Sequence, residues 1–344
     1  MAFILPQILA LTSLSGGGSK GGVHAPFGEG ARGASSPSHP PHAPPTPRCI
    51  TLLDGGMGQE LVRRSGDNPH PLWATRVMID HPGLVQAIHA DYFAAGASVA
   101  TTNTYALFHD RLVKFALDYR LTELQTAALR EAEAARAAHG RGRIAGSIGP
   151  LVASYRPDIF PPYAQAVTEY AAIAAQLAPR VDLIIAETVA SVAHASAVID
   201  GLRQGAPDLP LWLSVTVEDR DGTLLRSGEP LSALAPLVAP VQAVLANCSA
   251  PEAMDQALPL LAGFNKPFGA SANGFQQITS DFLKDNATVD ALTARAEMTP
   301  SLYADHVLAW VAAGATIVGG CCETGPDHIA EIARRLRAAG HTIA

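Results

Sequence analysis

Along most of the chain, short apolar runs alternate with longer stretches that are rich in alanine and leucine. The runs are seven to nine residues long and rich in strand-forming residues, which is typical of buried β-strands. Regular alternation of this kind predicts βαβ units and a parallel sheet. Eight runs are predicted to be strands: Ile50–Gly56, Ala97–Tyr105, Arg143–Pro150, Val181–Thr188, Leu211–Val217, Ala243–Ser249, Pro267–Asn273 and Thr316–Cys322.

The stretches between the strands predict helices, among them Leu121–His139, Tyr163–Leu177, Ser301–Ala313 and Asp327–Ala339. Eight strand–helix units in the last 296 residues fit a single (β/α)8 TIM-type barrel, which takes about 250 residues with room for insertions. A doubly wound open sheet is the alternative fold. It is disfavoured because no predicted strand is followed by a GxGxxG or GxxxxGK[ST] phosphate loop.

The first 48 residues differ in composition from the rest, because 16 of the 48 are proline or glycine. Such a segment has too little apolar surface to offset the entropy lost on ordering, so we expect a disordered tail over residues 1–48 and the barrel over residues 49–344. Its first residues are apolar, but no Lys or Arg precedes them and Pro6 interrupts them. A targeting tail, a linker or an over-long gene model is therefore favoured over a secretory signal, and a cytoplasmic protein is expected.

Composition narrows the function classes. The chain has 24 Lys and Arg against 31 Asp and Glu, a net charge of −7, and 48% hydrophobic residues. A nucleic-acid partner is not expected, since such proteins usually carry a basic face. A membrane span is not expected either, because no run of about 18 consecutive apolar residues occurs. The oligomeric state is left open.

Polar residues follow the predicted strands. In a (β/α)8 barrel the active site lies at the carboxyl ends of the strands, so these residues should converge on one rim. The third strand offers only the Gly149-Pro150 turn there. The other strand ends carry Asp54, Asn103, Glu187, Glu218, Cys248, Asn273, and the pair Cys321 and Cys322.

The four cysteines are too few for a disulfide scaffold, and two of them are adjacent, where a disulfide would be strained. Cys248 ends the sixth predicted strand, and Cys321 and Cys322 end the eighth. Three thiolates on one rim would suit Zn²⁺ and leave one coordination position open, as at catalytic zinc sites. The alternative is that they are small buried apolar residues. Cys49 precedes the first predicted strand and is expected to be inert.

An open position beside three thiolates suits a substrate thiol better than water, because three negative ligands weaken the Lewis acidity of the ion. Zinc binding deprotonates a thiol whose pKa is otherwise about 8.5 and keeps the sulfur nucleophilic. The predicted chemistry is alkyl transfer to a thiolate. A zinc hydrolase on the same barrel is a second possibility.

Several motifs resemble those of the homocysteine S-methyltransferase family, whose homocysteine-binding domain is a zinc-dependent (β/α)8 barrel. The resemblance spans about residues 50–339, and the last two motifs, in this order, are the specific ones. The motifs are LLDGGMGQEL (Leu52–Leu61), TTNTYA (Thr101–Ala106), GSIGP (Gly146–Pro150), ET (Glu187, Thr188), RSGEPL (Arg226–Leu231), ANCSAPEAM (Ala246–Met254) and IVGGCCETGPDHI (Ile317–Ile329).

The resemblance implies that the three cysteines bind zinc, with the sulfur of homocysteine as the fourth ligand, and that methionine is the product. It implies that Asp54 and Glu187 hold the substrate ammonium group. It also implies that the backbone N–H groups of residues 55–58, which include Gly55 and Gly56, receive the carboxylate. Asn103 is a weaker candidate. Where this chain has Gln59, the family more often has a hydroxyl residue, so no side-chain contact is assigned there.

For the methyl donor, the resemblance implies a small onium compound such as S-methylmethionine, betaine or S-adenosylmethionine. Aromatic faces attract such cations by about 0.5–2 kcal/mol. An alternative is a homocysteine-binding subunit that works with a separate corrinoid-dependent methyl carrier. The aromatic candidates are Trp73, Tyr105, Tyr155, Phe160 and Tyr163, of which Trp73 and Tyr105 lie nearest the motifs.

Overall fold

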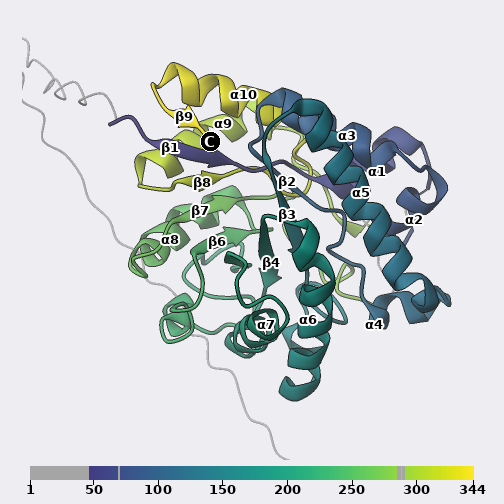
Figure 1. The fold of residues 1–344 in the computed structure, drawn as a ribbon. Coiled ribbons are helices and arrows are strands. Elements are labelled where there is room, and N and C mark those ends of the chain that lie inside the picture. The colour runs from purple at the N-terminus through teal and green to yellow at the C-terminus, as the bar shows by residue number, and fades with distance from the viewer. Residues whose placement is uncertain (1–45, 69, 285–287, 289–290) are drawn as a thin grey trace, which may run out of the picture. The chain divides into compact units, whose positions relative to one another are not determined.

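The computed structural model describes residues 46–344, apart from 69, 285–287, 289 and 290. In this part of the chain, nine strands form one parallel sheet that curls, with helices on its outer side (Figure 1). The strand order is β2-β3-β4-β5-β6-β7-β8-β1-β9. The strands are β1 (Cys49–Leu52), β2 (Val99–Thr101), β3 (Arg143–Ile148), β4 (Leu183–Val189), β5 (Leu211–Val215), β6 (Ala243–Asn247), β7 (Phe268–Ser271), β8 (Ile317–Val318) and β9 (Thr342–Ile343).

All eight predicted strands are present, and seven of them end before the predicted residue, which leaves the polar strand-end residues outside the hydrogen-bonded ladder. The ninth strand was not predicted. It pairs with β1 in parallel, and Cys49 lies opposite Thr342. The prediction that Cys49 precedes the first strand was therefore wrong, because β9 supplies the pairing partner that extends β1 to this residue. Most of the predicted tail, residues 1–45, lies outside the described residues.

The first and second strands also meet. Leu53, just after β1, forms an isolated parallel bridge with Val99 at the start of β2. The N–H group of Ser98 donates to the carbonyl oxygen of Leu52, with an N–O distance of 2.7 Å. The curl of the sheet thus brings β1 and β2 together, although four residues of β1 pair with β8 and β9 instead.

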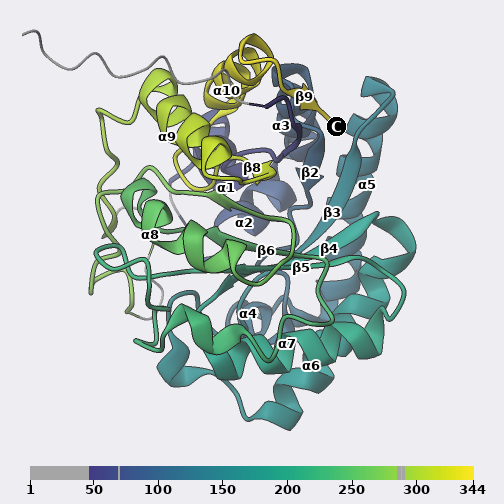
Figure 2. The same cartoon turned by 90° about the vertical axis from the view of Figure 1, so that its left-hand side faces the viewer.

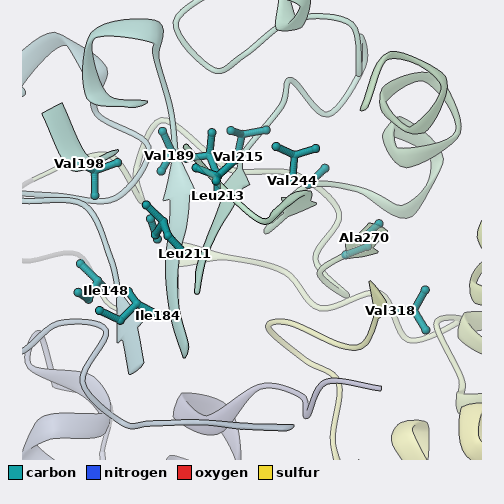
Figure 3. Close-up of a cluster of buried hydrophobic side chains, with 14 of the residues drawn as sticks. Ile148, Ile184, Val189, Val198, Leu211, Leu213, Val215, Val244, Ala270 and Val318 are labelled. Atoms are coloured by element: carbon teal, nitrogen blue, oxygen red, sulfur yellow. The ribbon is translucent and has the colours of Figure 1, made fainter. Parts of the chain in front are cut away.

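The two faces of the sheet carry separate apolar clusters, as the period-2 alternation of strands requires. Outward-facing side chains pack beneath the helices in the larger cluster, part of which Figure 3 shows, including Ile184, Leu213 and Val244. Inward-facing side chains form a second cluster inside the curl. Its members are Leu53, Val99, Ala145, Leu183, Ile185, Trp212, Ala243, Leu245 and Ile317.

Helices occupy most connections, and the four predicted ones are present to within one residue. None in the described part of the chain is long and apolar enough to cross a membrane. The α-helices are α1 (Met57–Ser65), α2 (Trp73–Asp80), α3 (Leu84–Ala95), α4 (His109–Leu112), α5 (Leu121–His139), α6 (Tyr163–Leu177), α7 (Val192–Gly205), α8 (Pro251–Ala262), α9 (Pro300–Ala312) and α10 (Pro326–Ala338).

The eight units are not equivalent. The connection from β1 to β2 holds three helices, whereas the connection from β5 to β6 has only the 3₁₀ turn η5 (Leu231–Leu234). Proline explains the missing α-helix, because Pro236 and Pro240 cannot donate a backbone hydrogen bond and would interrupt any helix that continued from η5. Figure 2 shows α9 and α10 side by side over β8 and β9.

A glycine in β7 allows the close approach of β8. A Cβ atom at Gly269 would lie 1.6 Å from the carbonyl oxygen of Ile317, whereas one at Gly146 in β3 would lie 3.4 Å from the nearest atom, a flexible leucine methyl group. We expect Gly269→Ala to cost about 3 kcal/mol or more of stability, because the backbone must move, and Gly146→Ala to cost about 1 kcal/mol or less. Thermal unfolding of both variants measures these costs. Equal losses of stability in the two variants would contradict the close approach of β8 to Gly269.

Candidate active site

One cavity opens at the carboxyl ends of the strands, and its volume is about 280 Å³. Its floor includes Ile185 and Leu245 of the inner apolar cluster, and the residues two positions further along these strands, Glu187 and Asn247, line the cavity above them. Ten of the residues singled out in the sequence line this cavity: Asp54, Gly55, Gly56, Trp73, Asn103, Tyr105, Glu187, Cys248, Cys321 and Cys322.

The three cysteines of the cavity form a cluster. Their Sγ atoms all lie within 4.8 Å of one another, and those of Cys248 and Cys321 are 2.6 Å apart. Cys248 directly follows β6 with a left-handed φ of 52°, an uncommon backbone conformation outside glycine. Cys321 and Cys322 follow β8 after two glycines. The fold therefore brings together thiols that are 73 residues apart in the chain.

The thiols influence one another's ionisation. Hydrogen bonds from Cys321 and Cys322 lower the pKa of Cys248 well below its ordinary value, and the bonds to Cys248 raise the pKa values of Cys321 and Cys322. Three clustered thiols that are wholly or partly buried cannot all lose their protons without a compensating positive charge. A soft divalent cation supplies that charge, and sulfur is its preferred ligand. The donor set thus fits a metal of the zinc type.

Asp54 lies just after β1 and is 2% exposed. Both of its carboxylate oxygens accept hydrogen bonds from Thr101, one from the backbone N–H and one from the hydroxyl group, each at 2.7 Å. Burial nevertheless raises the pKa of Asp54 to about 7. A cationic ligand group beside it would offset this cost of burial.

Glu187 belongs to β4 and faces the same cavity. Burial is the main cause that raises its pKa to about 8; a hydrogen bond with the side chain of Ser147 opposes the shift, and the nearby charges of Cys248 and Asp54 add to it. Its Oε1 atom is buried and has no hydrogen-bond partner among the described residues. An unpaired buried carboxylate oxygen is costly unless a ligand donates to it.

The raised pKa of Asp54 predicts how stability depends on pH. The folded state holds a proton up to about pH 7, which the unfolded chain releases near pH 3.8, so stability should fall as the pH rises between these values and then level off. Asp54→Asn should remove this component. We expect the Tm of the chelator-treated wild type to fall about 5 °C more than that of the variant between pH 5 and pH 8. Equal changes in Tm with pH in the wild type and in Asp54→Asn would contradict the raised pKa of Asp54.

The glycines after Asp54 serve the fold as well as the cavity. A Cβ atom at Gly55 would lie 2.2 Å from the carbonyl oxygen of Thr324, and the N–H of Gly56 donates to that same oxygen at 2.8 Å. The sequence had suggested that the Gly56 amide binds the substrate carboxylate, but this hydrogen bond already occupies it. The amides of Met57 and Gly58, in the first turn of α1, have no carbonyl partner within the helix and line the cavity.

Aromatic side chains form one wall of the cavity. The ring of Phe282 lies 5.6 Å from that of Trp73 and 6.1 Å from that of Tyr155, measured between centroids. The hydroxyl group of Tyr105 is 2.8 Å from Ser154 Oγ. Trp73 is the first residue of α2. Phe282 was not predicted, because it lies far from every motif in the sequence.

Other candidates have structural roles. Asn103 lines the cavity, but its Nδ2 donates to the carbonyl oxygen of Ala74 at 3.4 Å. The remaining four do not line the cavity. Glu218 is half-exposed and 3.9 Å from Arg226, Asn273 caps the turn at Phe275, Phe160 packs on His194, and the exposed Tyr163 donates to Asp200.

Three polar residues at the strand ends were also not predicted from the sequence. Ser147 of β3 lines the cavity, so the expectation that the third strand offers no side chain there was wrong. Thr101 holds Asp54, and Asn247 holds the turn after Glu187 by accepting from the N–H of Thr188 at 3.0 Å. The period-2 pattern could have revealed Ser147 and Asn247, since each lies two positions beyond an inward-facing apolar residue.

A cysteine cluster and two carboxylates at the carboxyl ends of a curled parallel sheet define an α/β enzyme with a site able to hold a metal ion. Comparison with known families makes the assignment specific. The family model described as "Homocysteine S-methyltransferase" matches residues 51–336. The chain belongs to this family.

Individual relatives agree with this assignment. Homocysteine S-methyltransferase of Escherichia coli is 31% identical over 313 residues, which cover 83% of this chain and 95% of the relative. Homocysteine S-methyltransferase YbgG of Bacillus subtilis is 27% identical over 314 residues, which cover 84% of this chain and 95% of the relative. The crystal structure of the homocysteine methyltransferase MmuM from Escherichia coli in its metallated form has a TM-score of 0.70 and 28% identity, covering 84% of this chain and 96% of that one.

Proposed function

We propose that the protein is a zinc-dependent enzyme that transfers a methyl group from a small onium donor to the thiolate of homocysteine and forms methionine. The observation that carries this proposal is the cluster of three thiols in the same cavity as the carboxylates of Asp54, which is buried, and Glu187, which is partly buried. The metal would activate the acceptor sulfur, and the carboxylates would recognise the ammonium group of an amino acid. Family membership supports the same reaction.

The fold is proposed to be one (β/α)8 barrel over residues 49–344, preceded by a separate tail over residues 1–48. The bridge between Leu53 and Val99 supports closure, because it links the first strand to the second after the other strands have paired in sequence order. The strand β9 would then be an addition outside the barrel. A closed barrel gathers all eight strand ends around one mouth.

Cys248, Cys321 and Cys322 would hold the zinc ion. A zinc ion held there would lower the pKa of a substrate thiol, so that homocysteine presents a thiolate at neutral pH. Asp54 and Glu187 would then bind the ammonium group of homocysteine, which offsets the cost of burying both carboxylates. The amides of Met57 and Gly58 at the N-terminus of α1 would bind its carboxylate.

The donor would lie against the aromatic wall formed by Trp73, Tyr155 and Phe282, where ring faces attract a sulfonium or quaternary ammonium group. In the transfer step the sulfur of homocysteine forms a bond to the methyl carbon while the bond from that carbon to the onium atom breaks. The donor leaves as a neutral sulfide or amine. No side chain has to take a proton in this step, so the chain contributes alignment of the two substrates.

The decisive experiment is to incubate the purified protein with Zn²⁺, homocysteine and either S-methylmethionine, betaine or S-adenosylmethionine, and to measure methionine. Formation of methionine with at least one donor, dependent on zinc, is the expected result. Methionine only in the presence of a methylated corrinoid protein would instead favour the subunit alternative. Hydrolysis of an ester or amide without any methyl transfer would favour the hydrolase alternative.

A further inference from the structure

The charged side chains that line the cavity fall into two groups. The acidic ones, Asp54 and Glu187, come from the strand ends, whereas the basic ones come from the connections that follow β2, β3 and β7. The basic group is Arg111, Lys114, Arg156 and Lys284. The cavity therefore has an acidic part at the strands and a basic part at the connections, so it is suited to a second ligand group that is anionic.

Two of these basic residues already have acidic partners. Arg156 pairs with Asp158 at 2.7 Å, and Lys284 pairs with Asp281 at 2.5 Å. Arg111 and Lys114 make no ion pair with any described residue. Both lie in the connection after β2, Arg111 in α4 and Lys114 in the 3₁₀ turn that follows it. Two cations without acidic partners at one cavity attract an anion.

Arg111 is the better placed of the two. Its Nη2 donates to the carbonyl oxygen of Pro150 at 2.7 Å, which fixes the guanidinium group, and its Nε is buried without a hydrogen-bond partner. Within the described part of the chain, Nη1 has no partner either. A fixed guanidinium group with unused donors is suited to a carboxylate, which accepts from arginine in a defined geometry.

The aromatic wall links Arg111 to the thiols. The guanidinium carbon lies 5.9 Å from the centroid of the Tyr105 ring, and the negative charge of Cys248 contributes to the raised pKa of Tyr105, so Tyr105 lies near both groups. Tyr155, beside the same thiols, contacts Phe282. A donor could therefore place its methyl-bearing cation near the sulfur atoms and an anionic group at Arg111.

We propose that Arg111, assisted by Lys114, binds the carboxylate of the methyl donor, and so selects onium compounds that carry a carboxylate over those that do not. The inference rests on the proposed function and adds a specificity-determining residue to it. The carboxylate of homocysteine is assigned to the other side of the cavity, at α1, because its ammonium group would lie between Asp54 and Glu187. The chemistry recognised is an onium carboxylate.

The test uses the zinc-loaded full chain, Arg111→Gln, and a pair of donors that differ only at the anion, S-methylmethionine and its carboxamide. We expect Arg111→Gln to raise the KM for S-methylmethionine about 30-fold, in line with a charge-assisted hydrogen bond, and to leave the KM for the amide and for homocysteine within about twofold. The matched control is Arg120→Gln, because Arg120 lies in the same connection, pairs with Glu123 and does not line the cavity.

Equal losses with the acid and the amide, or a rise in the KM for homocysteine, would overturn the inference while leaving the proposed function intact. Absence of methionine from every onium donor with the wild type would instead refute the proposed function. In that case calorimetric titration still decides the inference, since the wild type should bind the acid more tightly than the amide and Arg111→Gln should bind both alike. If the wild type bound the acid and the amide equally tightly, the inference would be overturned.

Discussion

Replacing Cys321 by alanine is expected to abolish zinc retention and to lower methyl transfer at least about 1,000-fold. The remaining two thiols cannot complete a site for a tetrahedral ion that needs three protein ligands and one substrate ligand. Without the cation, the acceptor thiol is largely protonated at pH 7. Cys248 then keeps only its hydrogen bond with Cys322. Metal content after gel filtration, measured with methionine formation, checks both parts.

Cys49→Ala is the matched control for Cys321→Ala. Cys49 is the one exposed cysteine among the four; it is the first residue of β1 and does not line the cavity. This variant should keep one zinc per chain and full activity. Full methyl transfer by metal-free Cys321→Ala would refute a role for the metal, and equal losses in both variants would point to a general defect in folding.

Glu187→Gln is expected to lower kcat/KM for homocysteine about 100-fold, because a charge-assisted hydrogen bond to the substrate ammonium group is replaced by a weaker neutral contact. The side chain keeps its size, so the cavity should keep its shape. Zinc content should stay at the wild-type value, which separates this variant from the cysteine variants. Steady-state kinetics with homocysteine as the varied substrate measures the effect.

The control for this prediction is Glu218→Gln, which removes a glutamate that comes shortly after β5. Glu218 has a side chain that is 42% exposed, and it does not line the cavity. Its replacement should leave kcat/KM within about twofold of the wild type. If Glu187→Gln behaved in the same way, the ammonium group of homocysteine would have to bind elsewhere in the cavity.

The sequence predicted most of the sheet because inward and outward positions in a parallel strand are both apolar, so each strand appears as a short continuous run. It also indicated the cysteines and carboxylates that line the cavity, since polar side chains at the ends of such runs stand out. The strand β9 could not be predicted, because Thr342 and Ile343 form no run and depend on pairing with β1. The missing helix between β5 and β6 was signalled only by its prolines.

Contacts between distant segments were beyond the sequence for a different reason. From the sequence, the amide of Gly56 appeared free to bind a carboxylate. In the structure it donates a hydrogen bond to the carbonyl oxygen of Thr324, which lies far along the chain. Arg111 and Phe282 lie in connections whose course over the cavity is set by tertiary packing rather than by local pattern. Buried serine and asparagine residues such as Ser147 look like ordinary strand residues until the inner face of the sheet is known.

The pairing of β9 with β1 has a practical consequence. Arg48 and Thr342 are joined by a backbone hydrogen bond of 3.0 Å, and both lie at the amino-terminal edge of the sheet, whereas the cavity opens at the carboxyl edge. An affinity handle or fluorophore attached after Ala344, or a surface tether at that end, would therefore face away from the mouth. Immobilised protein should keep substrate access, which makes sensor-based binding assays practicable for this enzyme.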